Sequence, residues 1–136
     1  MKNAELRMDC IDLLNKKESE GLDFKQEYHK SKVDFLHDIL CLANAYHEED
    51  RYIVFGISNN REILGVECDQ NRKQQSDICD FLRNANLNRT IKIELITIKI
   101  DAHEIDFLKI YNKPDKPFFL LKDYNEDKKI IRNGVV

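Results

Sequence analysis

The chain lacks the motifs that mark several common classes of site. It contains no G-x-x-x-x-G-K-[ST] and no G-x-G-x-x-G segment, which excludes a phosphate-binding glycine loop of either type. Its four cysteines include no C-x-x-C pair, which argues against a zinc knuckle. The serines stand in no nucleophile-elbow motif, and the four histidines have no mutual ligand spacing. Nothing in the sequence therefore predicts a P-loop enzyme, a zinc module or a serine hydrolase.

Long apolar runs and an excess of basic charge are also missing. No run approaches membrane-spanning length, and the first fifteen residues are amphipathic, so we expect neither a membrane span nor a signal peptide. The 22 basic and 25 acidic residues give a net charge of −3, which excludes a strongly basic, duplex-coating protein but allows local basic patches. Reduced thiols and a cytoplasmic location are the simplest interpretation of the cysteine pattern.

The composition that is present is typical of one globular domain. Hydrophobic residues make up 42% and charged residues 35% of the 136 residues, and neither a repeat nor a shift in composition marks an internal boundary. We expect an N-terminal helix within residues 1–17 and a domain over residues 18–136, which together form a single domain.

Hydrophobic periodicity predicts the order of the elements. Apolar residues at helical spacing predict three helices, over residues 3–15, 31–46 and 70–85. Alternating or continuous apolar stretches predict strands at 22–28, 52–57, 62–66, 91–100, 105–111, 118–121 and 129–132. Ser31 and Asp34 have the spacing of a capping box. The order predicts an α/β (α+β) fold, a mixed β-sheet with helices packed on it.

The predicted strand at 22–28 carries a charged face. Its apolar residues alternate with Asp23, Lys25 and Glu27, and Glu18 and Glu20 lie just upstream. Carboxylates gathered near a lysine are what a hydrolytic magnesium or manganese site needs, because hard cations prefer oxygen ligands and a lysine can stabilise developing charge. The acidic-x-Lys pattern is similar to that of many restriction-type nucleases. The alternative is a solvated strand face with cross-strand ion pairs.

Other residues have the chemistry for nucleic-acid contacts. If the fold gathers them, the basic side chains could bracket a groove for a phosphate backbone, although each alone could serve only solubility. These candidates are Lys16, Lys17, Lys30, Lys32, Arg51, Arg61, Arg72 and Lys73. Three tyrosines, Tyr28, Tyr46 and Tyr52, could stack on bases or belong to the core or its rim.

Three blocks together resemble one known family. The segment from Glu18 to Lys25, E-S-E-G-L-D-F-K, is similar to the E-S-x-x-(L/V)-E-F-K opening of the Schlafen AlbA_2 domain. The segments L-A-N-A at 42–45 and Y-I-V-F-G-I at 52–57 resemble its A-F-A-N-T and G-G-Y-(I/L)-(V/F)-(F/I)-G-V block, and I-L-G-V at 63–66 resembles the strand that closes its hairpin. The order and spacing agree over residues 18–136.

The resemblance implies a nucleic-acid-binding domain, with RNA or single-stranded or duplex DNA as partner. It further implies a metal-dependent endoribonuclease that acts on tRNA or other RNA with Mg or Mn, in phage defence, because animal Schlafens pair two such domains around a cleft that cleaves tRNA. Carried over by position, the catalytic residues are Glu18, Asp23 and Lys25, and the metal ligands are Glu18 and Asp23. A homodimer and further C-terminal domains are also implied.

Two departures from the family pattern favour an alternative. In the Schlafen nucleases, a third acidic residue follows the strand that ends in G-V. This chain has Ser58-Asn59-Asn60 at that position. The Gly-Gly before that strand is replaced by the acidic segment 47–51. The alternative is a non-catalytic DNA-binding, regulatory or interaction module of a larger ATPase or winged-helix protein.

Overall fold

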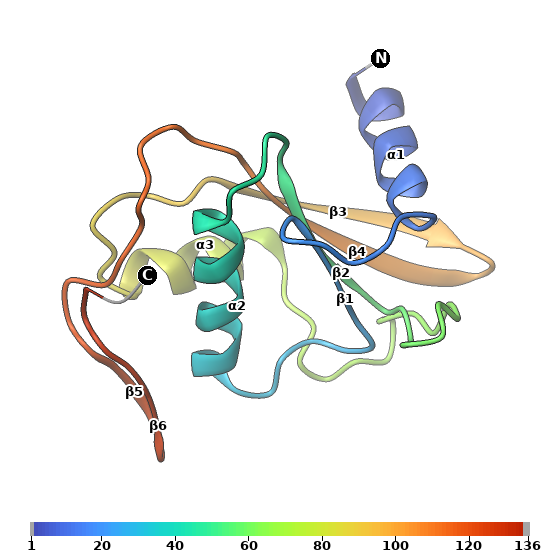
Figure 1. The fold of residues 1–136 in the computed structure, drawn as a ribbon. Coiled ribbons are helices and arrows are strands. Elements are labelled where there is room, and N and C mark those ends of the chain that lie inside the picture. Colours follow the sequence, from blue (N-terminus) through green and yellow to red (C-terminus); the bar gives the residue numbers. More distant parts are fainter. Residues whose placement is uncertain (1, 135–136) are drawn as a thin grey trace.

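The computed structural model describes residues 2–134 (Figure 1). In chain order, the elements in this part are α1 (Lys2–Leu13), β1 (Leu22–Lys25), α2 (Lys32–Asn44), β2 (Arg51–Phe55), α3 (Gln75–Asn84), β3 (Ile93–Ile100), β4 (His103–Ile110), β5 (Tyr124–Glu126) and β6 (Lys129–Ile131). None of these helices has the length and apolar character needed to cross a membrane.

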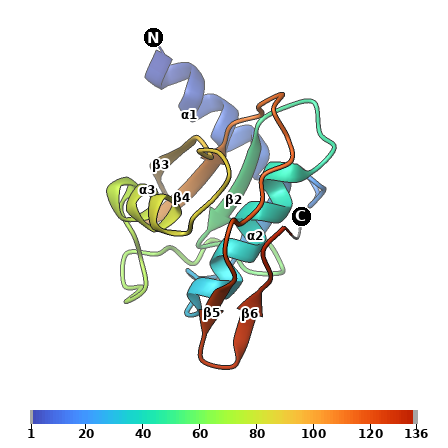
Figure 2. The ribbon, with the colours of Figure 1, turned by 90° about the vertical axis from the view of Figure 1, so that its left-hand side faces the viewer.

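Four of the strands form a mixed sheet in the order β1-β2-β4-β3. β1 runs parallel to β2, while β4 is antiparallel to both β2 and β3. The β3–β4 hairpin closes through Asp101 and Ala102, both with positive φ, as a type I′ turn requires. β5 and β6 form a separate hairpin that packs against α2 (Figure 2). The predicted α+β class, a mixed sheet with helices packed on it, is confirmed.

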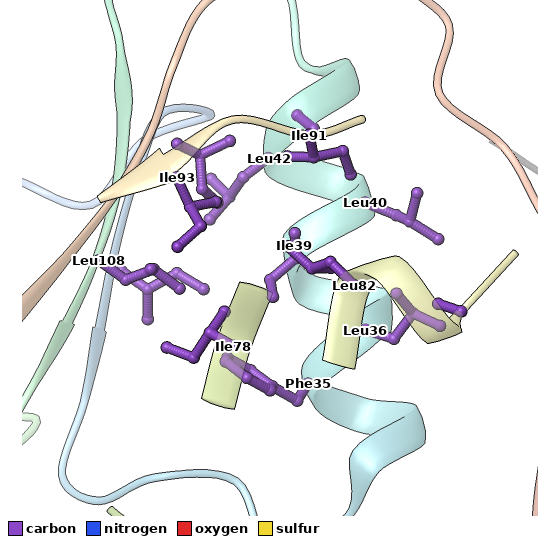
Figure 3. Packing of buried hydrophobic residues seen from close by; sticks show 14 of the residues in the cluster. Phe35, Leu36, Ile39, Leu40, Leu42, Ile78, Leu82, Ile91, Ile93 and Leu108 are labelled. Atoms are coloured by element: carbon purple, nitrogen blue, oxygen red, sulfur yellow. The ribbon is translucent and has the colours of Figure 1, made fainter. Parts of the chain in front are cut away.

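Helices cover both faces of the sheet, and each face has its own core. On one face, α2 and α3 pack through residues such as Leu36, Ile39 and Ile78 against Leu108 of β4, and these side chains point toward one another in Figure 3. On the other face, α1 contributes the buried Cys10 to a second cluster of apolar side chains. The regular alternation of the strands produces these two cores, because successive residues point to opposite faces.

The start of α2 is the best-predicted local feature. Ser31 is the N-cap, and its hydroxyl accepts a hydrogen bond from the backbone N–H of Asp34 at 3.2 Å. The third helix, predicted from residue 70, begins only at Gln75. Asp69 instead accepts hydrogen bonds from the backbone N–H groups of Tyr28 and Asn71, which holds the residues before the helix in a loop.

Two predicted strands are wrong. Residues 62–66 make only one isolated bridge, Ile57 to Ile63, because Gly56 and Gly65 have positive φ and the Gly56 carbonyl accepts from the N–H groups of both Leu64 and Gly65. Residues 118–121 likewise make only the bridge from Leu87 to Leu120.

The backbone at Phe118 is paired with a side chain and not with a neighbouring strand. The Asn44 amide donates to the Phe118 carbonyl at 2.9 Å and accepts from the Phe118 N–H at 2.7 Å. A side-chain amide with one donor and one acceptor edge thus replaces a strand ladder at this position.

The polar centre of the fold is the carboxylate of Asp106 on β4, which is fully buried. It accepts hydrogen bonds from the Tyr28 hydroxyl and the Thr97 hydroxyl, each at 2.6 Å, and from the Arg72 guanidinium through two N–H groups at 3.0 Å. The Tyr28 ring also stacks on Phe55, with centroids 4.0 Å apart. A buried charge is tolerated only when it is paired and hydrogen-bonded, so these contacts bind three segments together.

We predict that Tyr28→Phe lowers the free energy of unfolding by about 1.5–3 kcal/mol, because it removes a buried hydrogen bond to a charged group. Urea denaturation followed by circular dichroism measures the change. Tyr46→Phe is the matched control, since Tyr46 is 97% exposed. Equal stability of the two variants would contradict a structural role for the Tyr28 hydroxyl.

Candidate functional site

The charged face predicted for the first strand lies against α2. Leu22 and Phe24 are buried in the core beneath α1, whereas the side chains of Asp23 and Lys25 are only partly buried and point to the other face of the sheet. The strand ends at Lys25, so Glu27 lies in the following loop and is exposed. Alternation along β1 therefore places Asp23 and Lys25 side by side, as predicted.

A second carboxylate, which the sequence interpretation missed, comes from α2. The Lys25 Nζ atom lies 3.2 Å from Asp23 Oδ2 and 3.6 Å from Asp38 Oδ2. Asp38 Oδ2 also lies 2.6 Å from His29 Nε2, and the His29 side chain is only 8% exposed. One signal could have found Asp38, since it is an acid on a helix predicted to be buried around most of its circumference.

Burial and pairing set the charges of this group. Burial raises the pKa of Asp23, and the nearby Lys25 ammonium opposes that rise. Burial would also raise the pKa of Asp38, but the hydrogen bond with His29 and the charge of Lys25 lower it overall. Burial would lower the pKa of Lys25, yet the two carboxylates raise it. Lys25 therefore remains a cation, held between two acids.

The predicted carboxylates share one shallow pocket with Asp38. Glu18, Glu20, Asp23 and Asp38 all line it, with Cys41 of α2 beside them. One Glu18 carboxylate oxygen accepts a weak hydrogen bond from the Phe24 N–H at 3.4 Å. The fold thus brings Glu18, Asp23 and their neighbour Lys25 together.

The predicted magnesium or manganese site does not fit the side chains as they are placed. Within residues 2–134, no group of three or more His, Cys, Asp or Glu side chains is arranged to hold a metal ion. The Lys25 ammonium occupies the position between Asp23 and Asp38 where a shared cation would bind. Asn59, from the segment that stands in place of the family's third acid, lines a different pocket with His103.

The predicted basic contacts fall into separate groups. Arg51 is fully buried and donates to the carbonyls of Ala45 and His47 and to the side chain of Asn112, so it offers no surface to a nucleic acid. Arg61 lies over the Phe24 ring at 3.8 Å and donates to the Lys16 carbonyl.

The remaining single cations are exposed at the surface. Lys16 and Lys17 follow α1, and Lys30 forms an ion pair with Glu27 at 3.7 Å. Of the three tyrosines proposed to stack on bases, Tyr28 and Tyr52 are buried, and only Tyr46 is exposed.

Three of the predicted cations do come together. Lys32, Arg72 and Lys73 line one pocket between α2, α3 and β5. Aromatic side chains form the rest of its wall, namely Phe35, Phe81 and Tyr124. Segments that are far apart in the sequence therefore place basic and aromatic side chains around one cavity.

Comparisons with known proteins identify the family, and two solved structures show a distant similarity to the chain. No curated protein matches the chain. The N-terminal domain of a RecG-related protein from Nitrosomonas europaea shows 15% identity and a TM-score of 0.48, covering 74% of this chain and 71% of that domain. The DIP2311 protein from Corynebacterium diphtheriae shows 14% identity and a TM-score of 0.48, covering 96% of this chain, which spans only 27% of that protein.

The family described as "Schlafen, AlbA_2" matches residues 18–135, which is most of the chain and includes the carboxylate pocket and the basic, aromatic pocket. The match begins at Glu18, where the motif E-S-E-G-L-D-F-K begins, and leaves out α1. This chain belongs to the Schlafen AlbA_2 family.

Proposed function

We propose that this domain binds nucleic acid, with Lys32 and Lys73 contacting backbone phosphates. The observation that carries the proposal is the gathering of Lys32, Arg72 and Lys73 around one pocket with partly exposed aromatic side chains. Basic groups interleaved with aromatic rings are the arrangement by which single-stranded nucleic acids are bound. Membership of the Schlafen AlbA_2 family supports the same function.

The charge distribution makes this binding local. The chain has a net charge of −3, so its overall field does not attract a polyanion. The carboxylate pocket around Glu18 and Asp23 repels phosphate, and its one lysine is already paired with two acids. We therefore expect the contacts with the phosphate backbone at the basic pocket. Because these contacts are few, the binding constant should depend only modestly on salt concentration.

A finer proposal is a metal-dependent endoribonuclease that acts on tRNA or other RNA. It is favoured by one observation, that Glu18 and Asp23 line the same pocket. It requires Lys25 to release Asp23, because their ion pair neutralises the carboxylate. The paired state of Lys25 favours the alternative, a module that binds without cutting. A homodimer, further domains, a cytoplasmic location and a role in phage defence stay predictions.

Binding should weaken with salt and depend on Lys32. For a single strand, the logarithm of the binding constant falls by about 0.7 per phosphate contact for each tenfold rise in salt. Two contacts predict a loss of about five- to tenfold between roughly 50 and 200 mM salt. Lys32→Ala should weaken binding and make the slope shallower by about 0.7.

Fluorescence anisotropy with a labelled single-stranded oligonucleotide measures both quantities. Lys99→Ala is the control, because Lys99 is an exposed lysine of β3 outside the pocket. An affinity that is indifferent to salt would refute contacts to the phosphate backbone.

The nuclease proposal predicts cleavage of tRNA in Mn²⁺ and none in EDTA. Glu18→Gln and Asp23→Asn should each lower the rate by about a hundredfold or more, because metal-ion catalysis supplies several kcal/mol. Asp12→Asn, at an exposed position of α1, should leave the rate unchanged. Gel electrophoresis of the products provides the measurement. Intact tRNA would leave the domain a binding module, and cleavage that persists in both variants would show that Glu18 and Asp23 do not carry it.

A further inference from the structure

The basic, aromatic pocket has a stacking wall built from three elements. The ring of Phe35 on α2 stacks on Phe81 of α3, with centroids 5.6 Å apart and an interplanar angle of 10°. Tyr124 of β5 meets Phe81 edge to face, at 6.1 Å and 88°. Phe35 is buried, whereas Phe81 and Tyr124 keep part of their surface exposed. Part of two aromatic side chains is therefore available to a further planar ring.

The pocket is small. Its volume is about 370 Å³, near the lower end of the roughly 300–1,000 Å³ found for small-molecule sites. Such a space admits a single nucleotide and not the width of a double helix. The β5–β6 hairpin lies beside α2 (Figure 2). Tyr124 of that hairpin lines the pocket.

The three basic side chains of the pocket differ in how far carboxylates within the protein already neutralise them. The Arg72 guanidinium is held by Asp106, and its Nη1 atom donates to the Glu104 carboxylate at 2.8 Å. These two carboxylates largely neutralise its charge. Lys73 donates to the Asn71 carbonyl at 3.2 Å, and no carboxylate in the described part of the chain lies within ion-pair distance of Lys32 or Lys73. The Glu126 carboxylate interacts with the Ser31 hydroxyl and with the backbone N–H and the charge of Lys32, which lowers the pKa of Glu126. Lys73 is therefore the cation best able to take up an anion, with Lys32 beside it.

The polar side chains of α3 at the pocket can form hydrogen bonds with the edge of a nucleobase. Asp77 lines the pocket while its carboxylate accepts the Gln74 N–H at 2.9 Å, and the exposed Asn84 lies at the end of the helix. A carboxylate repels phosphate but accepts hydrogen bonds from an exocyclic amino group, and an amide both donates and accepts. The phosphate is therefore expected near the lysines and the base edge near α3.

We infer that this pocket holds one unstacked nucleobase together with its phosphate, either as a free nucleotide or as an unpaired position in a strand. The inference rests on the proposed function and deepens it by naming unpaired nucleotides as the ligand. A duplex cannot supply such a base without unstacking it, so single strands bind more tightly than duplexes of the same sequence.

Binding of AMP, adenosine and inorganic phosphate, and of a single-stranded oligoadenylate and its duplex, tests the inference by isothermal titration calorimetry. AMP should bind more tightly than adenosine or phosphate alone. Tyr124→Ala should weaken both AMP and single-strand binding by about tenfold or more, since it removes a stacking ring, and Tyr124→Phe should restore both. Lys73→Ala should weaken AMP but not adenosine, and Lys99→Ala should change neither.

The outcomes separate the inference from the function it rests on. If Tyr124→Ala and Lys73→Ala bind AMP as well as the wild type does, the pocket is not the site and the inference is overturned, even where the strand still binds with the expected salt dependence. If AMP binds and both variants lose it while no strand binds, the pocket takes a free nucleotide and the nucleic-acid function fails.

Discussion

A carboxylate buried at the centre of a sheet must have hydrogen-bond partners on both oxygens, and in this chain that carboxylate belongs to Asp106. Its donors come from Tyr28 in the loop after β1, Thr97 on β3 and Arg72 in the loop before α3. Because removing one partner leaves a buried charge uncompensated, the strands and the two loops have to assemble together. The packing of both cores takes place within this constraint.

Both candidate sites depend on that arrangement. The end of β1 and the loop after it join them, since Lys25, the last residue of β1, lies between the carboxylates of the acidic pocket while Tyr28 in the loop is anchored to Asp106. On the other side, the same carboxylate fixes Arg72, which holds the neighbouring Lys73 at the rim of the basic pocket. One pocket has its lysine paired with two carboxylates, and in the other no carboxylate of residues 2–134 forms an ion pair with Lys32 or Lys73. This asymmetry supports the proposal that the domain binds nucleic acid without cutting it.

The sequence predicted what local patterns determine. Alternation along β1, the Ser31 cap and the buried run of β2 all appear as expected, because strand period and capping chemistry act over a few residues. Of the two wrong strands, residues 62–66 turn at Gly56 and Gly65, which have positive φ, and at residues 118–121 the Asn44 side chain pairs with the backbone of Phe118. Burial of the second predicted helix could have singled out Asp38, but its approach to Lys25 and the basic pocket could not be predicted, because each joins segments that only the complete fold brings together.

The most direct test of this account is a double-mutant cycle on Arg72→Gln and Asp106→Asn, measured by urea denaturation. Arg72→Gln is expected to cost about 3 kcal/mol of unfolding free energy, because it leaves the buried Asp106 charge without its guanidinium. Asp106→Asn is expected to cost less, because Arg72 keeps its ion pair with Glu104. The double variant should lose much less than the sum, with a coupling energy above about 1 kcal/mol. Strictly additive losses would contradict the account, since the loop that carries Arg72 and Lys73 would then not be anchored on Asp106.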